Sequence, residues 1–367
     1  MPSTLASSAE PLASRYDVAL LDLDGVVYIG PAAVPHAREA LAAARALGMR
    51  LAFVTNNAAR PPSAVADQLT ELGVAADQAE VVTSAQAAAH HLAQRLPAGA
   101  PVLVVGTTGL HEALVERGLT PVTSADDQPQ AVVQGYSPEL TWRQLAEGAV
   151  AINRGVPWVA TNLDATVPST RGRLPGNGAM VAALRYATGR EPASTGKPDP
   201  AMHQESVDRS GARRPIVVGD RLDTDIAGAN AVGAPSLLVL TGVTSVAETL
   251  EAPAGARPSY LAADLRGLLD PHPAVSVSAG RASCRGWVVA AERDALLLRT
   301  ESEPGARSPS AGSAEDDWLD AVRALAVAAW RVTDEAGEGG WRPRVRGDGA
   351  AAGAALDRAD LGRFRLD

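Results

Sequence analysis

The chain has 367 residues, of which 46% are hydrophobic, and its net charge is −9. This length predicts two or three domains, and the acidic balance argues against nucleic acid or an anionic membrane surface as a partner. The single cysteine, Cys284, excludes an internal disulfide, and we expect neither a signal peptide nor a membrane span, which together indicate a cytoplasmic protein.

The first strong pattern is the apolar run Val18–Leu21, which is followed by Asp22-Leu23-Asp24-Gly25. Four consecutive apolar residues are typical of a buried strand in a parallel sheet. Because side chains two positions apart share a face of a strand, Asp22 and Asp24 are expected side by side at its carboxyl end, where open α/β sheets hold their sites. Two adjacent carboxylates repel each other, so this pair calls for a cation or a lysine nearby.

Helical and strand patterns then alternate. Strands are expected at 50–54 and 80–83, and helices at 37–47 and 63–72. The alternation predicts an α/β fold with a doubly wound, Rossmann-like parallel sheet. The second strand ends in Thr55-Asn56-Asn57, which places three small polar residues at the same edge as the aspartates.

From about residue 88 to 191 the alternation recurs without the carboxylates. Strands are expected at 102–105, 131–133 and 158–160, and helices at 110–117, 142–152 and 178–188. This segment is predicted to be an α/β domain inserted in the first one, because insertions are tolerated where the two ends of the inserted segment lie close together. We assign Trp142 and Trp158 to the core of this inserted cap.

The first domain resumes at about residue 192. Gly196-Lys197-Pro198 precedes an expected helix at 200–210, and the strand 216–218 leads to Asp220 and Asp225. Lys197 is the only lysine among 33 basic residues, which favours a role that needs a compact ammonium rather than a planar guanidinium. The catalytic core is therefore predicted over 16–87 and 192–270, after a flexible N-terminal tail at 1–15.

Beyond residue 271 the pattern changes. A hairpin is expected at 287–290 and 295–299, a loop at 303–315 and a helix at 318–332, and 337–353 is glycine-rich and weakly patterned. These features predict a small α+β appendage over 271–367.

Polar groups thus end several strands at one edge of the first sheet. The carboxylates of Asp22, Asp24 and Asp220 would form an oxygen-rich site, which suits Mg²⁺. Hydroxyl, amide and ammonium donors around that ion suit a phosphate. The residues therefore indicate magnesium-dependent phosphoryl transfer with an aspartate nucleophile.

These motifs, in this order, resemble those of the haloacid dehalogenase superfamily of phosphatases. Asp22-Leu23-Asp24-Gly25-Val26 is similar to the first motif of that family, Thr55 to the second, Lys197 to the third and Gly219 through Asp225 to the fourth. The insertion resembles the large α/β cap of the branch that includes nucleotide, pyridoxal-phosphate, phosphoglycolate and glycerol-phosphate phosphatases. Thr161-Asn162-Leu163-Asp164 and Pro175-Gly176-Asn177-Gly178 resemble segments of that cap.

The resemblance implies roles for individual residues. Asp22 would attack phosphorus, and Asp24 would pass protons to the leaving group and from water. Mg²⁺ would bind the Asp22 carboxylate, the Asp24 main-chain carbonyl and Asp220, with Asp225 as an outer partner. This division of labour requires the strand to end between Asp22 and Asp24 and the chain to turn at Gly25. The expected substrate-binding residues of the core are Thr55, Asn56, Asn57 and Lys197, and the cap candidates for the leaving group are Asn162, Asp164, Gly176, Asn177 and Gly178.

The combination of core and tail resembles an actinobacterial type of glycerol-3-phosphate phosphatase, in which the tail is likened to a truncated acetyltransferase fold. A small phosphorylated alcohol, with glycerol 3-phosphate first, is therefore the expected substrate. Phosphoglycolate, a nucleoside monophosphate and pyridoxal phosphate are alternatives with the same chemistry. A phosphotransferase or mutase and a regulatory binding protein are remoter alternatives, and a homodimer stays open.

Overall fold

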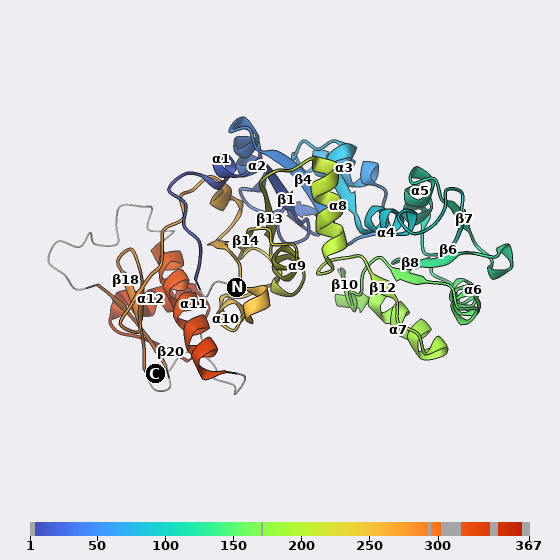
Figure 1. Ribbon diagram of the computed structural model, residues 1–367. Coiled ribbons are helices and arrows are strands. Elements are labelled where there is room, and N and C mark those ends of the chain that lie inside the picture. Colours follow the sequence, from blue (N-terminus) through green and yellow to red (C-terminus); the bar gives the residue numbers. More distant parts are fainter. Residues whose placement is uncertain (1–3, 170–171, 293–294, 302–316, 338–343, 362–367) are drawn as a thin grey trace.

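The computed structural model describes residues 4–169, 172–292, 295–301, 317–337 and 344–361. Figure 1 shows a central domain with the cap at one end and the C-terminal appendage at the other. Within these ranges no helix is long and apolar enough to cross a membrane.

The central domain is built on a six-stranded sheet with the order β15-β14-β13-β1-β4-β5, and all its strands run parallel. β1 is fully apolar, and β1 and β14 are buried along their whole length because both faces of the sheet are covered. The strands are β1 (Val18–Leu21), β4 (Arg50–Thr55), β5 (Val81–Thr83), β13 (Pro215–Gly219), β14 (Ser236–Val239) and β15 (Tyr260–Ala262).

Helices lie on both faces of this sheet (Figure 1). On one face α2 (Ala37–Ala46), α3 (Pro62–Glu71) and the turn Leu265–Leu268 pack on alternate strand residues such as Leu21 and Phe53. On the other face α4 (Ser84–Ala93), α8 (Pro200–Ser210) and α9 (Ala227–Ala231) pack on Leu20, Val54 and Val217. A short hairpin, β2 (Tyr28–Ile29) and β3 (Ala32–Ala33), follows the first aspartates.

The cap has its own five-stranded parallel sheet, with the order β12-β9-β8-β6-β7. The strands are β6 (Pro101–Val105), β7 (Thr120–Val122), β8 (Ala131–Gln134), β9 (Trp158–Ala160) and β12 (Ala193–Ser194). Its helices are α5 (Thr108–Glu116), α6 (Trp142–Asn153) and α7 (Asn177–Thr188). An antiparallel hairpin, β10 (Thr166–Ser169) and β11 (Gly172–Pro175), precedes α7.

The appendage is a five-stranded sheet in sequence order, antiparallel except for its last pair. The strands are β16 (Ser276–Ser278), β17 (Arg281–Cys284), β18 (Trp287–Ala291), β19 (Leu296–Thr300) and β20 (Val345–Gly347), and the helices are α11 (Asp317–Ala336) and α12 (Ala350–Arg358). The expected hairpin and long helix are confirmed as β18–β19 and α11. The likeness to a truncated acetyltransferase stays a prediction.

The appendage shares its apolar core with the central domain. Leu238 of β14 and Leu261 of β15 belong to the same buried cluster as Trp330 of α11. The helix α10 (Val246–Leu250) lies between them and contributes Leu250. The appendage therefore completes the cover over one end of the central sheet.

Two expected boundaries are wrong. Residues 4–15 are not a free tail: Leu5 and Leu12 are buried, Leu12 begins α1 (Leu12–Arg15), and Ser8 forms a β-bridge with His272. The cap extends further than residue 191, because β12 pairs with β9 and keeps the chain in the cap sheet through Ser194. Both features depend on partners more than 30 residues away in sequence, which local patterns do not reveal.

The remaining expectations concern two tryptophans of the cap and two segments of the appendage. Trp158 is buried in the cap, but Trp142 is 82% exposed, because it occupies the first position of α6 and faces solvent. The weakly patterned segment 337–353 contains β20 and the start of α12. The loop expected at 303–315 lies outside the described residues.

Candidate active site

The aspartate motif leaves the sheet at the end of β1. The strand ends at Leu21, one residue before Asp22 and not between the two aspartates, although the Asp22 N–H still donates to Val218 O at 2.9 Å. The expected turn is present at Gly25, whose φ is +87° and whose N–H donates to Tyr28 O at 2.8 Å. A side chain at this φ would be strained, and its Cβ would lie 2.5 Å from Asp220 Oδ2.

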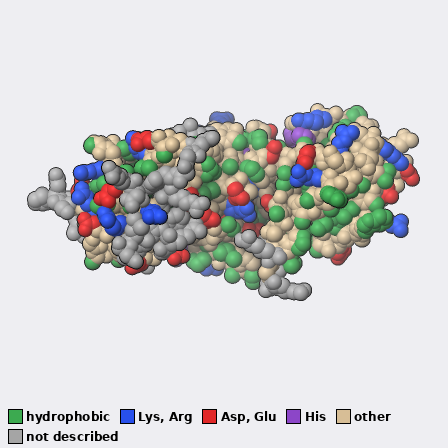
Figure 2. Space-filling model, turned by 90° about the horizontal axis from the view of Figure 1, so that it is seen from below, with side chains coloured by type: hydrophobic (Ala, Val, Ile, Leu, Met, Phe, Trp, Pro, Cys, Tyr) green, Lys and Arg blue, Asp and Glu red, His purple; other side chains and the backbone are tan. Residues whose placement is uncertain are grey.

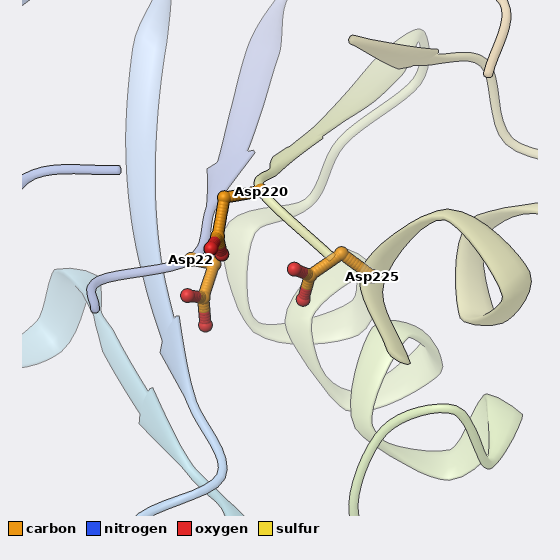
Figure 3. Close-up of side chains that lie close together, drawn as sticks. All are labelled: Asp22, Asp220 and Asp225. Atoms are coloured by element: carbon orange, nitrogen blue, oxygen red, sulfur yellow. The ribbon is translucent and has the colours of Figure 1, made fainter. Parts of the chain in front are cut away.

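Three carboxylates meet at this edge, with oxygen atoms within 4.8 Å of one another. Figure 3 shows Asp22 and Asp220 close together at the ends of neighbouring strands, with Asp225 facing them from the helical turn Leu222–Ile226. Asp220 Oδ2 accepts from the Val243 N–H at 2.6 Å. Asp220 Oδ1 is buried and has no hydrogen-bond partner within the described part of the chain.

Lys197 ties two of these carboxylates together. Its Nζ contacts Asp22 Oδ1 and lies 2.6 Å from Asp225 Oδ1, and its side chain is 3% exposed. Burial opposes the charge of Lys197, but Asp22 and Asp225 more than offset it and raise the pKa of the ammonium. The other oxygen of Asp225 accepts from the Arg221 N–H at 3.2 Å, so both oxygens of Asp225 are engaged by the protein.

The cluster carries more negative charge than the protein offsets. Asp22, Asp220 and Asp225 with Lys197 give a formal charge of −2 (three carboxylates and one ammonium). Burial and the neighbouring carboxylates raise the pKa of Asp22 well above its usual range, although Lys197 opposes this, and they raise the pKa of Asp220 to about 6. A divalent cation would neutralise this excess.

The residues fit such a cation. The unpartnered Asp220 Oδ1 and the Asp22 carboxylate offer the hard oxygen ligands that Mg²⁺ prefers. Gly242 lies against this group, where a Cβ would come within 2.0 Å of Asp220 Oδ2. Asp225 binds Lys197 and a backbone amide through its two oxygens, and its role as an outer partner of the metal stays a prediction.

Asp24 differs from its neighbour Asp22. Its residue is solvent-exposed, and no side-chain hydrogen bond or ion pair engages it among the described residues. Desolvation by the surrounding protein still raises the pKa of its carboxyl group, with Lys197 and Arg60 opposing. An accessible, unpaired carboxyl group with a raised pKa can exchange protons with a ligand.

The polar side chains of the segment after β4 form hydrogen bonds to neighbouring backbone groups. Thr55 Oγ1 accepts from the Asn57 N–H at 3.1 Å, and Asn57 Oδ1 accepts from the Ala59 N–H at 2.8 Å. Asn56 Oδ1 accepts from the Lys197 N–H at 2.9 Å, and its Nδ2 donates to Lys197 O at 3.2 Å. The side chains of Asn56 and Asn57 therefore hold loops in place, which sequence reasoning did not separate from substrate binding.

The five cap candidates fall into four residues that hold a loop of the cap in place and one whose side chain reaches the core. Asn162 Nδ2 donates to Asn56 O at 2.7 Å, and Asn177 Nδ2 donates to Asn162 O at 2.8 Å. At Gly176 a Cβ would lie 2.3 Å from Asp164 O, and at Gly178 a Cβ would lie 2.3 Å from Leu163 O. Four of the candidates thus shape and anchor the loop 162–164, and Asp164 is the one whose carboxylate reaches the core, with Oδ2 3.3 Å from Asn56 Nδ2.

Sequence reasoning missed the loop after β14. The Thr241 hydroxyl donates to Gly25 O, the Val243 N–H holds Asp220, and the Thr244 N–H donates to Asp220 O at 3.1 Å. The sequence pattern could have identified this loop, because Ser236–Val239 is another parallel strand and its carboxyl end lies at the same edge of the sheet. Arg221 was also missed; it pairs with the exposed Asp223, with Nη2 2.8 Å from Oδ2.

Comparisons with known proteins agree with this geometry. A sequence model for haloacid dehalogenase-like hydrolases matches residues 19–120, and one for HAD-hydrolase-like proteins matches residues 194–268. The chain is 44% identical to the D-glycerol 3-phosphate phosphatase of Mycobacterium tuberculosis over 96% of each chain, and 35% identical to an acid sugar phosphatase of Staphylococcus aureus over 63% of this chain and 89% of that protein.

Solved structures extend the comparison to the fold. The glycerol phosphate phosphatase of M. tuberculosis in complex with magnesium superposes with a TM-score of 0.84, at 43% identity, over 96% of this chain and 99% of the other. The p-nitrophenyl phosphatase of Archaeoglobus fulgidus superposes with a TM-score of 0.63, at 31% identity, over 69% of this chain and 98% of the other. The resemblance and the α/β fold predicted from the sequence are confirmed, and the chain belongs to the haloacid dehalogenase-like hydrolases.

Proposed function

We propose that this protein is a magnesium-dependent phosphatase that hydrolyses small phosphate monoesters, with glycerol 3-phosphate as its substrate. The observation that carries the proposal is the cluster at the carboxyl edge of the sheet. There a buried lysine bridges Asp22 and Asp225, and the neighbouring Asp220 has a second oxygen that lacks a partner within the described residues. This arrangement combines a nucleophile, a cation site and a fixed positive charge, the three elements that phosphoryl transfer needs.

The reaction would proceed in two steps on this chain's own residues. Asp22 attacks phosphorus, and the bond to the leaving alkoxide breaks as Asp24 gives that oxygen a proton. Asp24 then takes a proton from water, which attacks the aspartyl phosphate and releases phosphate. The raised pKa of Asp24 suits both transfers, which are worth about 10²–10⁴-fold in rate.

Phosphate would be held by the groups around Asp22. Lys197 is placed to offset the charge of the phosphoryl oxygens, and Thr55, buried at the end of β4, has a hydroxyl proton to donate to one of them. The Asn56 main-chain N–H lies in the same segment. Its side chain keeps Lys197 in register, which is a positioning role.

A magnesium ion would be bound by the carboxylates of Asp22 and Asp220 and by the main-chain carbonyl of Asp24. When bound it supplies electrostatic stabilisation of the phosphoryl oxygens. Asp225 would orient Lys197 and stay outside the ligand set, because both its oxygens are already engaged.

The substrate assignment rests on similarity along nearly the whole chain. A relative at 44% identity that matches both the cap and the appendage is named as a D-glycerol 3-phosphate phosphatase. A cap that contacts the core through Asn162 and Asn56 would enclose a small ester and exclude water. Phosphoglycolate, nucleoside monophosphates and pyridoxal phosphate are the competing substrates.

Phosphate release from p-nitrophenyl phosphate tests the reaction class. We expect turnover with Mg²⁺, none with EDTA, and a loss of about 10⁴-fold or more in Asp22→Asn with the fold intact by circular dichroism. Substantial turnover by Asp22→Asn would refute the nucleophile assignment, and no release with any divalent cation would refute the phosphatase.

A screen of small phosphate monoesters by kcat/KM tests the substrate, because that ratio defines discrimination. Glycerol 3-phosphate should rank first. A higher value for phosphoglycolate, a nucleotide or pyridoxal phosphate would move the assignment to that ester. Transfer of phosphate to an added sugar in place of water would indicate a phosphotransferase.

A further inference from the structure

The cap helix α5 meets the central domain at both of its ends. At its amino end, the Thr107 hydroxyl donates to Ala59 O, in the segment after β4, at 3.1 Å. At its carboxyl end, Arg117 contacts the Glu205 carboxylate of α8. Because α5 has nine residues and a helix rises about 1.5 Å per residue, roughly 14 Å separates these two contacts along its axis. The cap is thus joined to the core at two separate points.

Glu205 is the buried centre of the contact at the carboxyl end. Its side chain is 2% exposed, and its Oε1 is shared by Arg117 of the cap and by Arg209 of α8, which lies 3.4 Å away. His90 Nδ1 of α4 lies 3.2 Å from Oε2, although the two atoms are not aligned as a hydrogen bond. Arg209 also pairs with Glu116 of α5 at 3.1 Å. These five residues, which we call the Glu205 cluster, join the cap to two helices of the core.

The two ends of α5 differ in how readily they can leave the core. Separation at the carboxyl end would leave the buried Glu205 carboxylate with Arg209 alone, which Glu116 shares, and a buried carboxylate that loses a cation is strongly destabilised. Separation at the amino end exposes the Thr107 hydroxyl and a carbonyl, which water can satisfy. The cap is therefore held more firmly at the end that lies away from the aspartates.

The surface between these two ends suits a rotation. The residues of α4 that pack on the cap include Ala85, Ala88 and Ala89, and they share one buried cluster with Ala113 and Leu114 of α5. Small side chains interlock little, and packed helices can slide past each other over short distances. The amino end of α5 can therefore move across α4 while its carboxyl end stays in place.

We infer that Glu205 is a positioning residue that serves as the pivot of the cap. The Glu205 cluster holds the carboxyl end of α5 on α8, while the amino end separates from the segment after β4 to admit a phosphate monoester and to release its products. Closure about a fixed pivot returns Asn162 to the same place on Asn56, whose side chain holds Lys197 in register. The inference rests on the proposed phosphatase function and deepens it, because it names the residues that control access to that site.

Crosslinks at the two ends of α5 test the pivot. Glu116→Cys with Arg209→Cys places two thiols at the carboxyl end and leaves Glu205 in contact with the cap. Ala59→Cys with Thr107→Cys places two thiols at the amino end. The same short bismaleimide joins each pair. We expect the amino-end link to lower kcat/KM for p-nitrophenyl phosphate by about tenfold or more, and the carboxyl-end link to change it by less than about twofold.

Two controls separate restraint of the cap from modification of the thiols. N-ethylmaleimide adds bulk to the same cysteines without joining them, and it should leave turnover unchanged. The native Cys284 is fully buried, so the wild-type protein should keep its activity in the bismaleimide. An amino-end link without effect would show that the cap does not open there. A carboxyl-end link that lowers turnover equally would show that this end moves as well, and either result overturns the pivot.

Arg117→Gln tests the Glu205 cluster with a single side chain. Without its cation the cap closes out of register, so we expect kcat for p-nitrophenyl phosphate to fall about fivefold and KM to change by less than about twofold, because the phosphate-binding groups belong to the core. Arg117→Lys keeps the cation and should restore most of kcat. Arg154→Gln, which removes a half-exposed guanidinium of the cap, should change neither constant. A lower Tm in Arg117→Gln with kcat unchanged would reduce the cluster to a stabilising role and contradict the inference.

The proposed function can fail separately. If the wild-type protein releases no phosphate from any ester with Mg²⁺, the phosphatase assignment is wrong, and the pivot is judged by hydrogen exchange of the two crosslinked variants. The amino-end link should slow exchange of the amides of residues 106–109 about tenfold, because it holds the cap on the core, and the carboxyl-end link should not. Equal slowing by both links, or slowing by neither, would be incompatible with a pivot at Glu205.

Discussion

The two domains at the ends of the central sheet are attached to it in different ways. The appendage shares one buried apolar cluster with the core, in which Trp330 packs with Leu238 and Leu261. The Arg257 guanidinium of the core binds the Asp334 carboxylate through two contacts of 2.8 Å, and Arg323 donates to Leu261 O at 2.8 Å. An interface of this kind resembles a single hydrophobic core, so the appendage and the core should act as one unit.

Most apolar residues of the cap pack within the cap, but one of its two clusters also contains Ala58 of the central domain and Ala85, Ala88, Ala89 and Leu92 of α4. The contacts between cap and core nearest the site are polar. Near the site Asn162 donates to Asn56 O, and Thr107 donates to Ala59 O at 3.1 Å. Behind it Arg117 of the cap contacts the buried Glu205 of α8. Figure 2 shows apolar side chains on the outer surface at the cap end. Within the described residues, six of the nine large apolar side chains that are exposed lie in the cap: Val115, Trp142, Val150, Leu163, Leu174 and Tyr186.

This difference indicates that the cap and the appendage have different roles toward the site. Polar contacts can exchange with water at little net cost, whereas exposing a shared apolar core costs about 25 cal/mol per Å². We therefore expect the cap to separate from the core near the site more readily than the appendage does. Each prediction below tests one side of this contrast.

Removal of the appendage should have the largest effect. A chain that ends at Asp270 exposes Leu238, Leu250 and Leu261, which are buried in the cluster with α11. We expect this truncated chain to be insoluble or to lack a cooperative thermal transition, measured by the soluble fraction and by calorimetry. A soluble truncated chain with full p-nitrophenyl phosphatase activity would show that the appendage is an independent domain.

Trp330→Ala tests the same joint with a single side chain. Trp330 is fully buried, its Nε1–H donates to Thr249 O at 2.9 Å, and Arg257 lies over its ring. We expect a loss of about 3–5 kcal/mol in the free energy of unfolding, measured by urea denaturation. Activity and the circular dichroism signal should be lost in the same transition, because the interface between appendage and central domain is part of one hydrophobic core.

The matched control is Trp142→Ala in the cap, where the side chain is 82% exposed. It should change the free energy of unfolding by less than about 0.5 kcal/mol. If Trp330→Ala lost its transition in two separate steps, the appendage and the core would be two cooperative units and the contrast with the cap would weaken.

The sequence was most informative where the chain forms parallel strands. Such strands end at one edge, so Asp22, Thr55 and Asp220 could be placed together without any knowledge of distances, and the only lysine marked the missing positive charge. The same rule would have included Val243, since it follows β14, another strand of that sheet.

Features that depend on packing partners could not be predicted. The N-terminal segment was predicted as a tail because its hydrogen-bond partners, near Ser259 and His272, are more than 250 residues away in the sequence. Trp142 reads as a core residue because hydrophobicity alone does not tell which face of a helix turns inward. The cap candidates could be found but not ranked, because a motif does not show which polar atoms the fold has already engaged.

Acid should lower the stability of the folded chain. His272 is buried beside Tyr260, with Nε2 2.8 Å from Gly267 O, and burial lowers its pKa to about 4. The unfolded chain binds this proton more readily, with a pKa near 6.5, so stability is highest above pH 6.5 and falls as the pH drops toward 4. We expect His272 to account for a loss on the order of 2 kcal/mol between pH 7.5 and pH 5.

His272→Gln should make that decline shallower when urea denaturation is repeated at the two pH values. Part of the decline should remain, because burial also lowers the pKa of His203 in α8, to about 3. A decline of the same steepness in His272→Gln would show that His272 is not responsible.

The smallest effect on stability should come from the contact that closes the cap over the site. Asn162→Ala removes the donor to Asn56 O, a carbonyl that also accepts from the Ser84 hydroxyl at 2.6 Å and so stays partnered. We expect a change of less than about 1 kcal/mol in the free energy of unfolding but a fall of about tenfold in kcat/KM, because Asn56 aligns Lys197 and a looser cap orients the ester less well. Asn153→Ala, at the exposed end of α6, should change neither quantity. A large loss of stability in Asn162→Ala with unchanged kinetics would mean that the cap is bound to the core as firmly as the appendage is, and the distinction between a movable and a fixed addition would not hold.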